Sequence, residues 1–283
     1  MAAAACALIL TSCMEDEIVS PIDDSSLDAR TMTTTAGVST IVGLSSNNEL
    51  YTISTTSPAS VTAIIPIAGL KSGESILAID FNPANGRLYG LGSTGLLYSI
   101  DRNTGMATAV STTPMELAGT QFGFDFNPKT GMISVVSNKG QHIIVNPLGG
   151  AVLSTTWSTN TTARINSIAY MGASSTTAGA VMYDISGADY KLYSQDMKTG
   201  MLTSIGTTGL IINGDGGFDI TRNGTAFAIF TAKSDSTHTS PVFSTTPEDL
   251  SQEASRLYSI NLRTGVATSY GKVGNGLIGV AVM

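Results

Sequence analysis

The feature that most constrains the fold is a nine-residue motif that recurs along the chain. Three copies match closely: LYSIDRNTG (97–105), LYSQDMKTG (192–200) and LYSINLRTG (257–265). Two looser copies are LYTISTTSP (50–58) and HIIVNPLGG (142–150). The five copies start at positions 50, 97, 142, 192 and 257. They are therefore about 45 to 65 residues apart, which is typical of the blades of a β-propeller.

The chemistry of the motif predicts a strand, a turn and a second strand. Leu and Tyr alternate at its start, as the two faces of a strand require. The Asp or Asn that follows can accept hydrogen bonds from the turn backbone, and the Thr-Gly pair supplies a residue that adopts a positive φ.

A second element precedes the motif and completes a four-stranded unit. It reads IDFNP at 79–83 and FDFNP at 124–128, with looser matches at 168–170 and 218–220. An apolar segment follows each copy, at 88–91, 132–136, 181–185 and 226–230. Four complete units are therefore predicted between residues 75 and 273.

The fifth unit is split between the two ends of the chain. Residues 39–66 provide three strands without an inner partner, and GLIGVAVM (276–283) is one strand without a unit of its own. The C-terminal strand aligns with Ile76–Phe81, the inner strand of the first complete unit. We therefore predict an all-β, five-bladed β-propeller of four-stranded blades over residues 39–283, closed by the C-terminal strand pairing with the N-terminal blade. A sixth blade would need strands within residues 232–255, a segment that is too polar to supply them.

The composition agrees with an all-β chain. Only 12% of the 283 residues are charged, whereas 70 are Ser or Thr and 42% are hydrophobic. Disordered chains combine low hydrophobicity with high net charge, and surface helices need many Lys, Arg, Glu and Gln residues. A disordered chain and a helical bundle are therefore both excluded.

The N-terminus predicts an export signal and a lipid anchor. An apolar run at 2–10, too short to span a bilayer, is followed by LTSC (10–13), which resembles the lipobox of bacterial lipoproteins. We predict a signal peptide over residues 1–13 and acylation of Cys13. No Lys or Arg precedes the apolar run, which suggests that the true start lies upstream. MEDE (14–17) resembles the acidic surface-export tag of Bacteroidota lipoproteins, and residues 14–38 are predicted to be a flexible acidic tether.

Charge and cysteine usage narrow the classes of partner. Residues 1–38 contain six acidic residues and one base, so the remainder carries only −2 of the net charge of −7. This near-neutral remainder gives no electrostatic reason to expect nucleic acid or an anionic membrane surface as a partner. Both cysteines, Cys6 and Cys13, precede the predicted propeller. A disulfide scaffold, a cysteine-ligated zinc site and a cysteine nucleophile are excluded there.

Two blocks carry a resemblance to a known family. QFGFDFNP (121–128) and AIDFNPANGRLYGLGSTGLLYSI (78–100) resemble an uncharacterised bacterial family, domain of unknown function 4394, over nearly the whole of residues 39–283. The GFDFNP and LYGL blocks are the specific parts of the match. The resemblance implies a secreted or surface propeller and no activity.

Three aspartates are the main candidate site. Asp80, Asp125 and Asp219 hold equivalent positions on inner strands, where the other two blades carry Ala169 and Ala281. Because inner strands line the central channel, three carboxyls could bind a cation or the hydroxyls of a sugar. The alternative is structural: each Asp would fix the strand end or the following Asn-Pro turn by accepting hydrogen bonds from backbone N–H groups.

Other candidates are weaker. The Gly-rich segment Asn213–Gly217 with Asp215 and Asp219 could hold calcium or be a plain turn between blades. The lone Trp157, on a predicted loop, could stack on a sugar if exposed or fill a gap between blades if buried. His142 and His238 show no spacing of a metal site or catalytic triad, so both are predicted to be satisfied or solvated. Residues 232–255 are predicted to be a long insertion that either binds a partner or is mobile.

These observations favour a surface-anchored binding module with a glycan or protein ligand, and they assign no catalytic residue and no cofactor. An outer-membrane location follows from the predicted anchor. Two alternatives stay open: a carbohydrate-active enzyme that uses the channel carboxylates, and a structural envelope protein.

Overall fold

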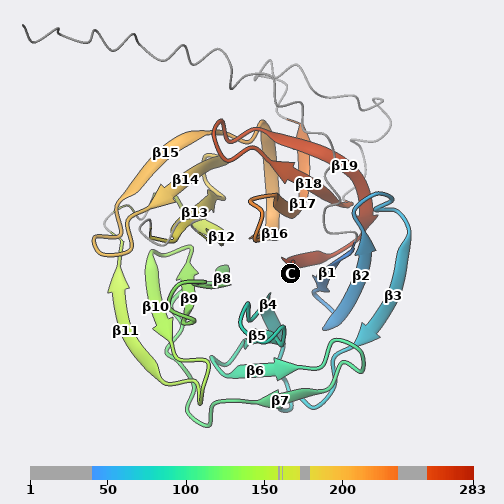
Figure 1. Ribbon diagram of the computed structural model, residues 1–283, viewed down its shortest axis with the longest axis vertical. Coiled ribbons are helices and arrows are strands. Elements are labelled where there is room, and N and C mark those ends of the chain that lie inside the picture. The colour runs from blue at the N-terminus through green and yellow to red at the C-terminus, as the bar shows by residue number, and fades with distance from the viewer. Residues whose placement is uncertain (1–39, 159, 161, 173–178, 235–253) are drawn as a thin grey trace, which may run out of the picture. The chain divides into compact units, whose positions relative to one another are not determined.

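The fold is a five-bladed β-propeller. The computed structural model describes residues 40–158, 160, 162–172, 179–234 and 254–283. Its strands form five four-stranded antiparallel sheets around a central axis, with β4, β8, β12, β16 and β20 innermost (Figure 1). No helix is found in these ranges, and hence none that could cross a bilayer. The predicted fold class is confirmed.

The blades follow the predicted units. Blade 1 consists of β20 (Leu277–Ala281), β1 (Thr40–Ser45), β2 (Glu49–Ser54) and β3 (Val61–Pro66). Blade 2 consists of β4 (Ile76–Phe81), β5 (Leu88–Gly92), β6 (Leu97–Ile100) and β7 (Ala107–Ala109). Blade 3 consists of β8 (Phe122–Phe126), β9 (Ile133–Ser137), β10 (Gln141–Val145) and β11 (Val152–Trp157). Blade 4 consists of β12 (Ile165–Met171), β13 (Val181–Ser186), β14 (Lys191–Gln195) and β15 (Leu202–Thr207). Blade 5 consists of β16 (Leu210–Ile220), β17 (Ala226–Ser234), β18 (Ser255–Ile260) and β19 (Ala267–Gly274).

The C-terminal strand closes the ring, as the split fifth unit predicts. β20 pairs antiparallel with β1, and Val42 lies opposite Ala281 in the register. Strand β20 is therefore the inner strand of a blade whose other three strands come from the start of the described chain. This pairing protects the inner edge of β1 from solvent.

The recurring motif forms the third strand of each blade and the turn after it. In blade 2, Asp101 Oδ1 accepts the N–H groups of Asn103 at 2.8 Å and Thr104 at 3.2 Å. Gly105 has φ of 72°, and Asp196 and Asn261 make the same turn in blades 4 and 5. The hydrogen-bonding role assigned to the Asp or Asn is confirmed.

The hydrophobic core lies between the blades. Five buried clusters are found in the described residues, and each one joins side chains of two neighbouring blades. Leu44 of blade 1 and Tyr98 of blade 2, for example, are both fully buried in the cluster that joins these two blades. Burial of these side chains, worth about 1.5–3 kcal/mol for each large apolar residue, holds neighbouring blades together.

Two local predictions in blade 5 are corrected. Residues 232–234 belong to β17 and pair with Leu210–Ile212, whereas 235–253 lie outside the described residues. The Gly-rich segment Asn213–Gly217 is not a turn between blades but part of β16, where the register shifts between Ile212 and Gly216. Glycine is required there because a Cβ on Gly216 would lie 2.1 Å from the Phe230 ring, and one on Gly217 would lie 2.2 Å from the Val280 nitrogen.

Candidate functional site

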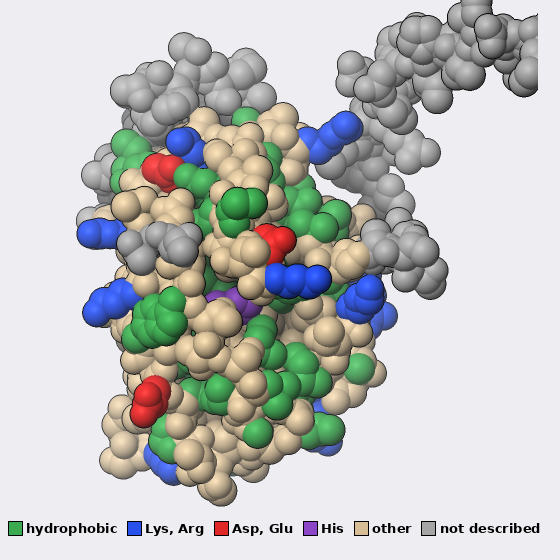
Figure 2. Space-filling view, turned by 90° about the vertical axis from the view of Figure 1, so that its left-hand side faces the viewer, with side chains coloured by type: hydrophobic (Ala, Val, Ile, Leu, Met, Phe, Trp, Pro, Cys, Tyr) green, Lys and Arg blue, Asp and Glu red, His purple; other side chains and the backbone are tan. Residues whose placement is uncertain are grey.

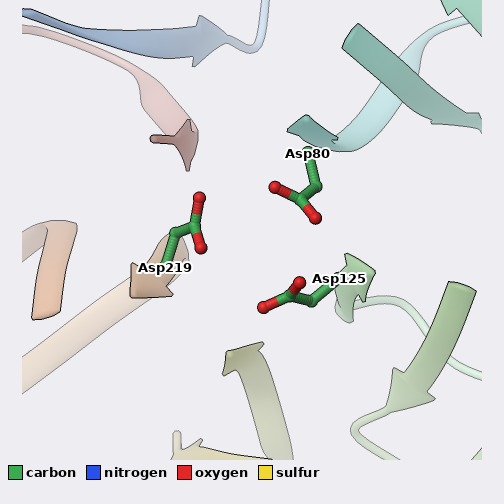
Figure 3. Close-up of side chains that lie close together, drawn as sticks. All are labelled: Asp80, Asp125 and Asp219. Carbon is green, nitrogen blue, oxygen red and sulfur yellow. The ribbon is translucent and has the colours of Figure 1, made fainter. Parts of the chain in front are cut away.

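The three candidate aspartates converge at one end of the central channel. Asp80, Asp125 and Asp219 are each the penultimate residue of an inner strand, in β4, β8 and β16. Their side chains point toward one another across the axis (Figure 3). One carboxyl oxygen from each lies within 4.8 Å of the others, and all three residues are buried. We call these three residues the Asp ring.

Each carboxyl of the Asp ring is bound to backbone N–H groups. Asp80 Oδ1 accepts the N–H of Phe81 at 2.6 Å, and Asp219 Oδ1 accepts that of Ile220 at 2.6 Å. The second oxygen reaches the next blade in the ring. Asp80 Oδ2 accepts the N–H of Phe126 at 2.8 Å, Asp125 Oδ2 accepts that of Tyr170 at 2.7 Å, and Asp219 Oδ2 accepts that of Val282 at 2.6 Å. The aspartates therefore accept backbone hydrogen bonds at the strand ends, as the structural alternative predicts. Their second oxygens also connect neighbouring blades.

Burial and proximity change the acidity of the Asp ring. Burial is the largest cause that raises the pKa of each of the three carboxyls well above its usual value. The neighbouring carboxyls add to this, because two negative charges a few ångströms apart repel. The backbone N–H groups act in the opposite direction, but the net direction is upward. The ring therefore retains protons at pH values where an exposed Asp has lost them.

A cavity of about 730 Å³ lies over the Asp ring. Its lining includes the three aspartates and residues from every blade. The blades contribute Met283 (blade 1), Ala84 (blade 2), Pro128 (blade 3), Gly172 (blade 4) and Arg222 (blade 5), among others. We call this end of the propeller the cavity face, and the other end the opposite face.

Asp215 does not join the Asp ring. It is exposed, and it precedes Asp219 by four residues of strand β16, which is roughly 13 Å of extended chain. In the described part of the chain, the group of acidic residues close enough to share an ion is the Asp ring itself. The calcium site predicted from Asp215 and Asp219 together is therefore not assembled.

Trp157 is the last residue of β11, not part of a loop, and 55% of its surface is exposed. It pairs with Gln141, at the start of β10, whereas the turn of blade 3 that lines the cavity lies at the other end of this sheet. Trp157 is thus exposed and does not fill a gap between blades. The residue lies far from the Asp ring along the blade. His238 and most of the 232–255 insertion lie outside the described residues.

His142 is a buried, satisfied histidine. Its Nε2 lies 3.0 Å from Ser134 Oγ, which in turn lies 2.7 Å from the Tyr170 hydroxyl. Burial lowers the pKa of His142 to about 4, so the ring is neutral near pH 7. A Ser–His pair can be a nucleophile and its base, but Ser134 is only 1% exposed and its hydroxyl contacts Tyr170 of blade 4. Substrate cannot reach it.

Sequence reasoning missed the buried acid Asp184. Asp184 in β13 is completely buried, and neither of its oxygens has a hydrogen-bond partner. Burial raises its pKa well above the usual value, which favours the neutral acid. A lone Asp in the mostly apolar segment 181–185 is the signal that could have found it, but the sequence does not show that both of its oxygens are buried without a partner.

Comparison with known proteins agrees with this architecture. The family model described as Domain of unknown function (DUF4394) matches residues 49–281. The chain belongs to this family. The match begins in β2 and ends with β20, so the DUF4394 domain comprises almost the whole propeller. Among curated proteins, none matches the chain.

Proposed function

We propose that this protein is a surface-anchored binding module that holds a glycan or an envelope protein in the cavity over the Asp ring. The observation that carries the proposal is the cavity itself, which measures about 730 Å³ and draws its lining from all five blades. Ligand sites typically occupy about 300–1,000 Å³ and carry a few convergent polar groups. The Asp ring provides such groups at the floor of this cavity.

The proposed location rests on the N-terminal sequence. The apolar run at 2–10, the LTSC segment and the acidic residues that follow support acylation of Cys13 and display at the cell surface. Two or more acyl chains on one residue would provide stable membrane attachment, since a single chain binds only marginally. Residues 14–38 would then separate the propeller from the membrane.

The geometry of the Asp ring favours binding over glycoside hydrolysis. Hydrolytic carboxyl pairs flank the scissile bond at about 5–10 Å, and at least one of them must be free to attack or to activate water. Here one carboxyl oxygen of each residue lies within 4.8 Å of the others, and all three side chains accept backbone N–H groups. We therefore assign the Asp ring no catalytic role.

A cavity-blocking substitution tests the proposal. Ala84 is exposed on a turn that lines the cavity, so Ala84→Trp should obstruct the entrance. Ala188 is a matched control, because it is exposed on a comparable turn at the opposite face. In both turns the alanine N–H binds the side-chain oxygen of the residue two positions earlier.

The full chain would be probed on a glycan array and against solubilised envelope proteins. We expect the wild-type and Ala188→Trp proteins to retain the same ligand and Ala84→Trp to lose it. Absence of any ligand, or equal binding by all three proteins, would contradict the proposal and favour a structural role in the envelope.

A further inference from the structure

The charged residues of the propeller are distributed unevenly between its two ends. In an antiparallel four-stranded blade, the first and third turns lie at one end and the second turn at the other. The first and third turns of the described blades lie at the cavity face and carry six exposed bases and two exposed acids. The bases are Arg87, Arg102, Lys129, Lys198, Arg222 and Arg263, and the acids are Asp101 and Asp196.

The opposite face lacks this excess. Its described turns and the connections between blades contain three bases and three acids. The bases Lys71, Lys139 and Arg164 and the acid Glu116 are exposed, whereas Asp189 is half-buried and Glu74 is buried. The near-neutral total charge of the propeller therefore conceals a basic end. On the side of the molecule shown in Figure 2, hydrophobic and uncharged polar side chains predominate, and Lys, Arg, Asp and Glu side chains are scattered among them.

Two of the bases are held at the rim of the cavity. Arg222 lines the cavity and donates a hydrogen bond to the carbonyl oxygen of Pro83. The Arg102 guanidinium lies 5.9 Å from the centroid of the Phe81 ring, and Phe81 also lines the cavity. The turns of Arg87 and Lys129 contribute Gly86 and Pro128 to the lining.

None of the six bases is paired with a carboxylate of the described residues. The described residues form one ion pair, Lys191–Asp189, and none of the six bases takes part in it. Asp101 and Asp196, the exposed acids on the same turns, each accept two N–H groups of their own turn. No carboxylate in these ranges therefore neutralises the six bases directly.

We infer that the ligand held over the Asp ring is an acidic polysaccharide, whose carboxylate, sulfate or phosphate groups bind the bases of the rim while its hydroxyls bind the floor. This inference rests on the proposed function. The floor is compatible with an anion, because the Asp ring retains protons and its oxygens already accept N–H groups. Protonated carboxyls can donate hydrogen bonds to hydroxyl or anionic oxygens.

A glycan fits this cavity better than single-stranded nucleic acid. Proteins that bind single strands stack the bases on accessible aromatic side chains. The aromatic residues that line this cavity are Phe81, Phe126 and Tyr170, and each of them is at least 95% buried. A ligand recognised through hydroxyls and charged oxygens needs no such stacking surface.

Charge-neutralising variants of the full chain test the inference. The rim variant neutralises Arg222 and the bases of two turns that line the cavity, so it carries Arg87→Gln, Lys129→Gln and Arg222→Gln together. The control variant is Lys71→Gln, Lys139→Gln and Lys272→Gln, which removes the same charge from exposed positions outside the cavity face. The probes are polygalacturonate and dextran sulfate, each with a neutral counterpart: methyl-esterified polygalacturonate and dextran.

We expect the wild type to bind at least one of the charged polymers and not its neutral counterpart. The rim variant should bind on the order of tenfold more weakly, since charge-assisted hydrogen bonds are lost, and the control variant should bind as the wild type does. Equal weakening in both variants would show diffuse polyanion binding and overturn the inference. Equal binding of single-stranded DNA, lost in the rim variant, would overturn it as well.

The two proposals fail in distinguishable ways. If a neutral glycan or a protein binds, is blocked by Ala84→Trp and is unaffected by the rim variant, the anionic ligand is wrong and the binding cavity stands. If no charged or neutral glycan and no envelope protein binds the wild type, both are wrong.

Discussion

The carboxyls of the Asp ring supply hydrogen bonds that the sheets cannot provide. Each blade is a separate sheet, so the inner strands of neighbouring blades share no ladder of main-chain bonds. The carboxyl of Asp80 reaches an N–H group 46 residues away in the next blade, and that of Asp219 reaches one 63 residues away. Ala169 and Ala281 occupy the same position in the other two blades, where no such bond can form. The Asp ring thus joins blade 2 to 3, 3 to 4 and 5 to 1.

At the residue scale, we predict that Asp219→Asn destabilises the protein by roughly 1–3 kcal/mol, because the amide NH₂ cannot accept one of the two backbone N–H groups. Asp184→Asn is the matched control. Its carboxyl is equally buried but accepts no hydrogen bond, so we expect a smaller change. Urea unfolding at pH 5 measures both variants. A loss of stability in Asp184→Asn that equals the loss in Asp219→Asn would contradict the assigned bonds.

The raised pKa values also predict a pH dependence of stability. An Asp whose pKa is raised on folding keeps its proton in the folded state at pH values where the unfolded chain releases it. Its stabilising contribution is complete below the unfolded pKa, about 3.9, and is lost as the pH rises through the folded pKa. This applies to the Asp ring and to Asp184, in which burial raises the pKa. His142 has the opposite effect: its pKa is lowered to about 4, so its contribution is lost as the pH falls below about 6.5.

Comparing Asp184→Asn with the wild type isolates one of these groups. Asn cannot release a proton, so the stability of the variant relative to the wild type should increase as the pH rises from 4 to 8. Free energies of unfolding from urea titrations at several pH values measure the difference. A constant difference over this range would show that Asp184 has an ordinary pKa in the folded state.

At the scale of elements, strand β20 is the part on which ring closure depends. Its Leu277 and Val280 are buried in the cluster between blades 5 and 1. The Leu277 N–H donates to Ser255 Oγ at 2.9 Å, and the Val282 N–H that follows the strand donates to Asp219. Blade 1 without β20 would expose the inner edge of β1 at the centre of the molecule.

We predict that a chain lacking residues 276–283 does not fold to a stable monomer. Each large apolar side chain of β20 contributes about 1.5–3 kcal/mol, and the total stability of a domain is only about 5–15 kcal/mol. Circular dichroism and size-exclusion chromatography would show loss of sheet structure or association. A synthetic peptide of residues 276–283 should restore the fold, whereas a peptide with Leu277→Asp and Val280→Asp should not. A truncated monomer that melts at the wild-type temperature would refute this role of β20.

The outer strand β11 has a different balance of contacts. All six of its residues are exposed, including Val152, Leu153 and Trp157. Replacement of an exposed side chain typically changes stability by less than about 0.5 kcal/mol. Trp157 can therefore be replaced without loss of the fold. Because it lies away from the cavity face, it also serves as a reference position for binding experiments at the cavity.

At the scale of the whole molecule, the proposed anchor and the proposed ligand site make separable predictions. Cys13→Ala should move the protein from the membrane fraction to the soluble fraction, because the acylated thiol would be its attachment. Binding by the propeller should be unchanged, since Cys13 precedes the family match at 49–281. Cell fractionation and ligand binding measure the two properties. Unaltered membrane partition of Cys13→Ala would contradict the lipoprotein assignment.

The sequence by itself determined the number of blades and the way in which the ring closes. Both follow from local patterns. The recurring nine-residue motif marks the third strand of a blade and the turn after it, and the unpaired GLIGVAVM segment supplies the missing inner strand. The equivalent positions of Asp80, Asp125 and Asp219 were also readable, because repeats place equivalent residues at equivalent points of a fold. The Gly-rich segment in β16 was misassigned, because the close approach of Phe230 and Val280 cannot be read from neighbouring residues.

Only the tertiary structure decided what these residues do together. Hydrogen bonds of the Asp ring span 45 to 63 residues of sequence, so the partner of each carboxyl is set by blade packing. The same is true of the isolation of Asp184 and the burial of His142. It is also true of the six bases, which are scattered through a nearly neutral sequence and come together because the first and third turns of each blade share one end of an antiparallel sheet. Local chemistry specified the blades, and their closure around one axis created the cavity.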